Sequence, residues 1–145
     1  MHGYSGTPLP KKLGIKDGAR VAVLGAPESF ALAGIPTTNR LAGKLDVIVA
    51  FVHDRAKLAK RIGDARKHMT PACGLWIAFP KKASGVTTDV TEHVVRELAL
   101  PTGLVDNKVC AIDEVYTGLR LVIRRELRDA PPPARRRASA RSTGR

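Results

Sequence analysis

A loop near the middle of the chain gathers residues whose chemistry suits an anion. Residues 81–88 read Lys-Lys-Ala-Ser-Gly-Val-Thr-Thr, which combines two ammonium groups, three hydroxyls and a glycine. A helix is expected to begin directly after this loop, and a helix N-terminus offers unpaired N–H groups and a partial positive charge. The candidate anion ligands are therefore Lys81, Lys82, Ser84, Gly85 and Thr88. The alternative is a solvated loop whose hydroxyl groups satisfy the helix end.

Three further candidates follow two other apolar runs. Gly25 and Ser29 come after the run 20–24, and His53 comes after the run 45–52. Apolar runs of this length, ended by glycine, proline or polar residues, are typical of buried parallel strands. Each of these candidates is therefore expected at the carboxyl end of a strand.

Two acidic residues bear on how such a site could work. Asp54 could form an acid–base pair with His53, although Asp54 is also placed to cap the helix expected over 55–69. Asp89, with Glu92 three residues later, fits a capping box. If Asp89 occupies the helix N–H groups, an anion must bind over residues 81–85 instead.

Several catalytic chemistries are absent from the sequence. There is no Gly-x-x-x-x-Gly-Lys-Ser/Thr phosphate loop, no Gly-x-Ser-x-Gly elbow, and no Cys-x-x-Cys or His-Glu-x-x-His metal spacing. Cys73 and Cys110 lie in apolar surroundings and are interpreted as small buried side chains. We therefore expect binding rather than catalysis, with no catalytic residue, metal or cofactor.

The order of the expected elements predicts the fold class. Strands over 20–24, 45–52 and 74–80 alternate with helices over 28–33, 55–69 and the region after Asp89, and residues 37–41 could add a short edge strand. This alternation predicts a mainly parallel sheet with right-handed crossovers. The last two strands, over 105–112 and 119–127, are too close for a crossover and predict an antiparallel hairpin. The fold class is therefore α/β, a three-layer Rossmann-like open sheet, whose ligands bind outside the strand carboxyl ends.

Composition divides the chain into three parts. Its 145 residues are 43% hydrophobic, which excludes disorder throughout, and no apolar run is long enough to cross a membrane. We predict an N-terminal arm over 1–19, a Rossmann-like domain over 20–129, and a tail over 130–145 that is too polar to bury itself. The N-terminus has no signal-peptide pattern, so we expect a cytoplasmic protein.

Charge suggests the class of partner. The chain carries 25 Lys and Arg against 13 Asp and Glu, a net charge of +12, and the tail supplies five Arg and no acid. Such a balance favours an anionic small molecule, an acidic protein or nucleic acid. Nucleic acid would bind electrostatically, because only 4% of residues are aromatic. The basic residues that could bind it are Lys57, Lys60, Arg61 and Lys67 on the expected helix and Arg135, Arg136 and Arg137 in the tail.

The pattern resembles a truncated class I methyltransferase. Residues 12–25 resemble the lead-in to the first strand of that family, and residues 46–52, 74–80 and the final hairpin resemble its fourth and fifth strands and its last pair. The first loop of the family normally reads Gly-x-Gly-x-Gly, whereas residues 25–29 read Gly-Ala-Pro-Glu-Ser. The short interval before the next strand leaves no room for the unit whose acidic residue holds the ribose. The resemblance implies a degenerate S-adenosylmethionine-dependent methyltransferase as one possible function.

A second resemblance is to small bacterial proteins described only as a domain of unknown function. It rests on the strings at 3–14 (Gly-Tyr-Ser-Gly-Thr-Pro-Leu-Pro-Lys-Lys-Leu-Gly), 80–86 (Pro-Lys-Lys-Ala-Ser-Gly-Val) and 109–119. That family implies no activity. From the residues themselves we expect a non-catalytic binding or regulatory module with an anion or nucleotide pocket. The alternatives are a nucleic-acid-associated protein and the degenerate methyltransferase.

Overall fold

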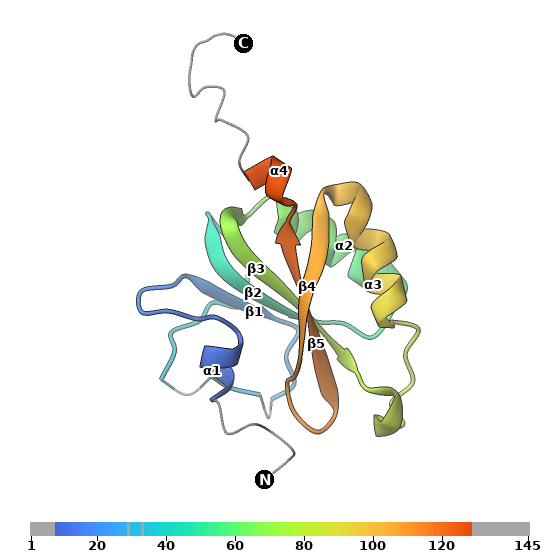
Figure 1. Ribbon diagram of the computed structural model, residues 1–145. Helices are drawn as coiled ribbons and strands as arrows, with labels where there is room; N and C mark the ends of the chain where they lie inside the picture. Colours follow the sequence, from blue (N-terminus) through green and yellow to red (C-terminus); the bar gives the residue numbers. More distant parts are fainter. Residues whose placement is uncertain (1–7, 29, 33, 129–145) are drawn as a thin grey trace, which may run out of the picture.

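A five-stranded mixed sheet forms the centre of the molecule. The computed structural model describes residues 8–28, 30–32 and 34–128, and Figure 1 shows the arrangement. The sheet order is β1-β2-β3-β5-β4, in which β1, β2 and β3 run parallel while β5 is antiparallel to both β3 and β4. The predicted α/β class, with a mainly parallel sheet and a terminal antiparallel hairpin, is confirmed. The strands are β1 (Val21–Leu24), β2 (Leu45–Phe51), β3 (Met69–Pro80), β4 (Leu104–Ala111) and β5 (Tyr116–Ile123).

Two helices cover one face of the sheet (Figure 1). Helix α2 (Arg55–Arg66) buries Leu58, Ile62 and Ala65, which recur on one side of a 3.6-residue helix. Helix α3 (Glu92–Ala99) buries Val95 and Ala99 and is followed by the 3₁₀ turn η2 (Leu100–Thr102). These side chains form one apolar cluster with the sheet residues that point toward them, among them Ile48, Leu75 and Leu121.

The opposite face is covered by the arm rather than by long helices. Helix α1 (Leu9–Lys12) and the residues after it lie against the sheet, and Leu13 is only 1% exposed. The indole Nε1 of Trp76 donates a hydrogen bond to the Leu13 carbonyl oxygen at 3.1 Å. Residues 8–19 therefore form a packed layer of the fold. Residues 1–7 of the predicted arm and the predicted tail over 130–145 lie outside the described residues.

The helix predicted over 28–33 is wrong for the residues described there. Glu28 and residues 30–32 have no helical structure, and Phe30 and Leu32 instead pack against the arm-covered face of the sheet. Burial of these apolar side chains outweighs their local helix propensity. The edge strand considered over 37–41 is reduced to a single bridge between Thr38 and Ala22.

Two predicted boundaries also differ from the structure. Helix α2 ends at Arg66, and Met69 begins β3 instead of completing the helix. The pairing with β2 shifts from Leu45–Met69 to Val47–Gly74, so the intervening stretch with Pro71 bulges out of the ladder, as a residue without an N–H requires. Residues 125–127, predicted as the end of a strand, instead belong to the short helix α4 (Arg125–Arg128) beyond the end of β5.

Candidate ligand site at the carboxyl edge of the sheet

Three predicted site residues follow the parallel strands at one edge. Gly25, His53 and Lys81 come just after β1, β2 and β3, whose parallel pairing brings their carboxyl ends together. Gly25 has φ 67°, and a Cβ built there would lie 3.0 Å from the Phe51 carbonyl oxygen. Gly25 therefore allows a tight turn against β2 and offers no side chain to a ligand.

The loop after β3 is held by its own hydrogen bonds. Residues 82–84 form the 3₁₀ turn η1 (Lys82–Ser84), and Gly85 closes it at φ 78°. The Ser84 hydroxyl donates to the Lys81 carbonyl oxygen at 2.7 Å and accepts from the Val86 N–H at 3.2 Å. Ser84 and Gly85 thus shape the loop, which is the alternative the sequence left open for them.

Thr88 ties the same loop to the end of β2. Its hydroxyl donates to the His53 carbonyl oxygen at 2.6 Å and accepts from the Val90 N–H at 3.0 Å. Thr88 and His53 therefore lie next to each other, as predicted, but Thr88 contacts the backbone of His53 and not its imidazole ring. The loop is consequently fixed to two neighbouring strands rather than free in solvent.

A cavity of about 660 Å³ lies between the end of β3 and the start of α3, and we call it the carboxyl-edge cavity. Its volume falls within the range of about 300–1,000 Å³ that is usual for small-molecule sites. Lys81, Lys82 and Thr88 line it, whereas Gly25 and His53 do not. Ser29 lies outside the described residues. The remaining lining residues are Phe79, Pro80, Val86, Val90, Thr91, Glu92, His93 and Thr117.

The positive charges that line this cavity are not paired with acidic residues in the part of the chain that the structure describes. Within the described residues, Lys81 and Lys82 form no ion pair. Glu92 is the lining acid, and its carboxylate pairs with Arg96 at 2.8 Å. The cavity therefore presents two ammonium groups against one carboxylate that already has a cationic partner.

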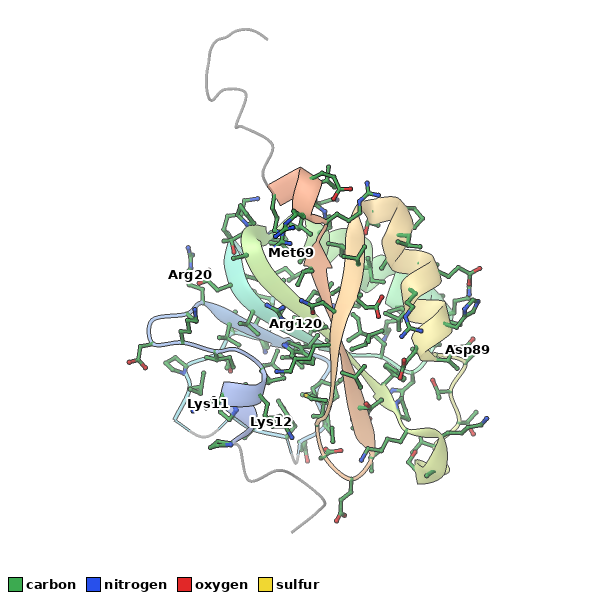
Figure 2. All side chains as sticks on the ribbon, in the orientation of Figure 1. Lys11, Lys12, Arg20, Met69, Asp89 and Arg120 are labelled. Carbon is green, nitrogen blue, oxygen red and sulfur yellow. The ribbon has the colours of Figure 1, made fainter. Side chains whose placement is uncertain are left out.

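The capping role predicted for Asp89 is wrong. Thr91 caps α3, because its hydroxyl accepts the Val94 N–H at 3.2 Å. Asp89, which is labelled in Figure 2, instead accepts the backbone N–H of Arg55 at 2.8 Å, at the first turn of α2. The reason is that α3 begins two residues later than the capping box requires, while the Arg55 N–H has no partner within its own helix. Asp54 caps α2 as predicted, by accepting the Lys57 N–H at 2.7 Å.

Tyr116 lies beside His53 with two further aromatic rings, and this group was not predicted from the sequence. The Tyr116 hydroxyl lies 2.7 Å from Nε2 of His53, and the Phe51 ring lies 5.0 Å from the Tyr116 ring and 4.9 Å from the Phe30 ring. Burial, and secondarily the nearby charge of Asp113, raises the pKa of Tyr116. Tyr116 reaches this edge because antiparallel pairing sets it opposite Pro80. Only the cross-strand register could have revealed this contact.

The two cysteines are not reactive groups of this site. Burial raises the pKa of the Cys73 thiol to about 12, with the charge of Asp46 as a second cause, and burial also raises the pKa of Cys110. Both thiols therefore stay protonated near neutral pH, and their prediction as buried side chains is confirmed. Within the described ranges, no three His, Cys, Asp or Glu residues are grouped to hold a metal ion. In the same ranges, no helix has the length and apolarity needed to cross a membrane.

Comparison with solved structures identifies the fold more closely. A ribosomal-protein methylase from Lactobacillus delbrueckii subsp. bulgaricus matches 80% of this chain and 76% of its own, with a TM-score of 0.54 and 14% identity. Magnesium protoporphyrin IX methyltransferase from Synechocystis, with bound S-adenosylmethionine, matches 74% of this chain and 71% of its own, with a TM-score of 0.53 and 14% identity. The chain therefore has a methyltransferase-like Rossmann fold.

The extent of these likenesses is limited. The chain spans only 51% of a second structure of the same Synechocystis enzyme, with bound S-adenosylhomocysteine, and 41% of a methyltransferase from Pyrococcus furiosus. No family model matches the chain, and no curated protein matches its sequence. The resemblance to a small bacterial family accordingly stays a prediction.

Proposed function

We propose that this chain is a non-catalytic binding or regulatory module that holds a small anion in the carboxyl-edge cavity. A nucleotide or another phosphorylated molecule is the expected class of ligand. One observation carries the proposal: Lys81 and Lys82 line a hollow of about 660 Å³ and form no ion pair within the described residues. In Rossmann-like sheets this edge is the usual place for a ligand.

The other lining residues support a phosphorylated ligand. Thr91 and His93 border the same hollow as the lysines and can donate hydrogen bonds to phosphate oxygens. Phe79, Pro80 and Val86 supply an apolar wall of the kind that packs against a base or ring. The ligand would therefore combine an anionic end with an apolar body.

Ligand-induced thermal shifts test this proposal. The panel contains nucleoside mono-, di- and triphosphates, inorganic phosphate and pyrophosphate, and the variant is Lys81→Ala with Lys82→Ala. We expect at least one phosphorylated compound to raise the melting temperature of the wild type, and the double variant to lose that shift. The matched control, Lys11→Ala with Lys57→Ala, removes two exposed lysines elsewhere and should keep it. A shift that survives in the cavity variant would contradict the proposal.

A second candidate is a degenerate S-adenosylmethionine-dependent methyltransferase. The comparisons support it more directly than the anion site, because the similar chains are methyltransferases and one was solved with S-adenosylmethionine. The His53–Tyr116 pair at the strand ends also supports it, since a hydrogen-bonded imidazole and phenol can exchange a proton.

The residues after β1 do not fit that cofactor in the family's usual way. Pro27 has no N–H to donate, and Phe30 packs against Phe51 with ring centroids 4.9 Å apart. Thr38 exchanges backbone hydrogen bonds with Val21 and Val23, at 3.0 and 2.8 Å, on the edge of β1 where a second unit would add its strand. We therefore derive no methyl-transfer step.

Calorimetry with S-adenosylmethionine and S-adenosylhomocysteine separates the two candidates. Saturable heat that persists in the Lys81→Ala, Lys82→Ala variant would support the second candidate. The absence of heat with both compounds would remove it, while the phosphate panel would still test the first.

A further inference from the structure

The opposite edge of the sheet collects positive charge. The cations lie around the amino ends of β1, β2 and β3, the end of α2, and α4 beyond β5 (Figures 1 and 2). We call them the amino-edge cluster, which consists of Arg20, Lys44, Arg66, Lys67, Arg125 and Arg128.

Contacts between these elements show that the cluster is continuous. The Lys44 ammonium donates to the Lys67 carbonyl oxygen at 3.1 Å, which joins the start of β2 to the end of α2. A Cβ built on Gly43 would lie 3.1 Å from an Arg20 guanidinium nitrogen, which places β1 beside them. Arg66 and Arg128 share a hollow of about 310 Å³ with Lys44.

A second hollow adjoins the first. It measures about 400 Å³ and is lined by Arg120, Lys16 and Asp46, and both hollows include Thr70. Arg120 is half-buried and, like the amino-edge cluster, forms no ion pair within the described residues. The positive surface therefore continues inward from the cluster along β5.

The acidic residues at or near this edge, Asp17, Asp46, Asp64 and Glu126, form no ion pair with the amino-edge cluster within the described residues. The described ion pairs are Arg55–Glu97, Lys60–Asp64 and the pairs of Arg96 with Glu92 and Asp106. None of them includes a residue of the amino-edge cluster, although Asp64 is only three residues before Lys67. Asp46 uses a carboxylate oxygen to accept the Arg20 backbone N–H at 2.9 Å. The six cations of the cluster outnumber these four acids, and like charges repel one another, so an anionic partner would stabilise this edge.

We propose that the amino-edge cluster binds the phosphate backbone of a nucleic-acid duplex without reading its sequence. A single small anion needs one pocket, whereas these cations extend across the ends of three strands and two helices. In the sequence, α4 is followed by residues 129–145, which carry five Arg and one acid, Asp129. Guanidinium groups bind phosphate oxygens through paired hydrogen bonds. The surface lies at the other end of the strands from the carboxyl-edge cavity, so it is independent of the proposed function.

The aromatic residues favour a duplex over a single strand. Single strands are usually held by bases stacked on exposed aromatic rings. Here Trp76, Phe51 and Phe79 are each 5% exposed or less, and both hollows are lined without an aromatic residue. Contacts with a duplex would be electrostatic, and affinity would fall steeply with salt.

The amino-edge cluster differs from the nucleic-acid surface that the sequence predicted on α2. On the outer side of α2, Lys60 already pairs with Asp64 at 2.9 Å, and Arg61 is half-buried. Lys67, at the end of that helix, is the one residue common to the predicted surface and the amino-edge cluster. The positive field is therefore concentrated at the helix end and the strand starts.

Fluorescence anisotropy with a random-sequence DNA duplex tests the inference on the full chain. The variant combines Lys44→Gln, Lys67→Gln, Arg125→Gln and Arg128→Gln, all at exposed positions. The matched control combines Lys11→Gln, Arg55→Gln, Lys57→Gln and Lys108→Gln, which removes the same charge at exposed positions outside both proposed sites. Circular dichroism melting confirms that both variants fold.

We expect the wild type to bind, and the amino-edge variant to bind more than about a hundredfold more weakly at about 50 mM salt. Raising the salt from about 50 to about 200 mM should weaken binding by the wild type about a hundredfold more than binding by the variant, because the variant lacks four phosphate contacts. The control should stay close to the wild type.

Four results would overturn the inference. They are no duplex binding by the wild type at low salt, equal weakening in the control, unchanged binding in both variants, and a preference for single-stranded DNA or anionic lipid vesicles over the duplex.

Discussion

The guanidinium group of Arg120 occupies the space above Gly74 where any other residue would place its side chain. A Cβ built on Gly74 would lie 2.5 Å from Arg120 Nε and 3.1 Å from Cζ. Arg120, which is labelled in Figure 2, pairs with Trp76 across β5 and β3. Gly74 is two residues before Trp76 on the same face, so the Arg120 side chain reaches it diagonally. The glycine and the arginine are therefore two parts of one packing arrangement beside the amino-edge hollows.

Gly74→Ala should destabilise the fold through Arg120. The added methyl group would overlap the guanidinium group of Arg120, so this flexible, half-buried side chain must move. We expect a cost of about 1 kcal/mol, at the lower end of the range for overpacking. Urea unfolding followed by Trp76 fluorescence measures the change in the free energy of unfolding.

A double-mutant cycle supplies the control for this prediction. In an Arg120→Ala background the overlap is absent, so Gly74→Ala should then cost much less than in the wild type. An equal cost in both backgrounds would show that Arg120 is not the neighbour that excludes a side chain at position 74.

The strands and the hairpin could be predicted from the sequence because their signals are local. The continuous apolar run of β2 marks a strand buried on both faces, and the short link between β4 and β5 leaves antiparallel pairing as the solution. Lys81, Lys82 and Thr88 line one cavity, and their role as ligands stays a prediction. The position of that cavity at a strand end follows from parallel topology alone.

The parts that could not be predicted depend on contacts between distant residues. Phe30 lies in a segment of helical composition, but packing against Phe51 holds it in an irregular segment. Asp89 fits a capping box by its spacing, yet it bonds to Arg55, 34 residues away. Tyr116 meets His53 only because β3 and β5 pair in one register. Composition and periodicity carry no information about such partners.

Leu13→Ala should show that the arm stabilises the fold. Leu13 is 1% exposed and its carbonyl oxygen accepts the Trp76 indole N–H, so truncation opens a cavity over that ring. Buried Leu→Ala changes cost about 2–5 kcal/mol. Urea unfolding measures the loss, and Trp76 emission should shift to the red as water approaches the ring. Lys11→Ala, an exposed change in the same arm, should leave both readouts unchanged. A Leu13→Ala variant as stable as the wild type would contradict the packing role of the arm.

Tyr116→Phe should make stability less dependent on alkaline pH. The pKa of Tyr116 is raised in the folded chain by burial and then by Asp113, so the folded state keeps the phenol proton more tightly than the unfolded state. The resulting stabilisation is fully present below the unfolded pKa of about 10 and is lost as pH rises through the folded pKa. Wild-type unfolding free energy should therefore fall more steeply above about pH 10 than that of the variant. Parallel pH curves would contradict this assignment.

Near neutral pH the same change removes the hydrogen bond between Tyr116 and His53. The expected loss is about 0.5–1.5 kcal/mol in the free energy of unfolding. His53→Ala provides the comparison, because it removes the same bond but keeps the phenol. It should therefore retain the alkaline fall in stability that Tyr116→Phe lacks.

Asp89→Ala should loosen the first turn of α2 rather than that of α3. The Asp89 carboxylate accepts the Arg55 N–H, whereas Thr91 accepts the Val94 N–H at the start of α3. Loss of such a side-chain acceptor costs about 0.5–2 kcal/mol. Amide hydrogen exchange should therefore accelerate at Arg55 in Asp89→Ala and at Val94 in Thr91→Ala. Asp89→Asn keeps an acceptor oxygen and should protect Arg55 nearly as well as the wild type does. Faster exchange at Val94 in Asp89→Ala would contradict this prediction, because it would mean that Asp89 caps α3 as the sequence indicated.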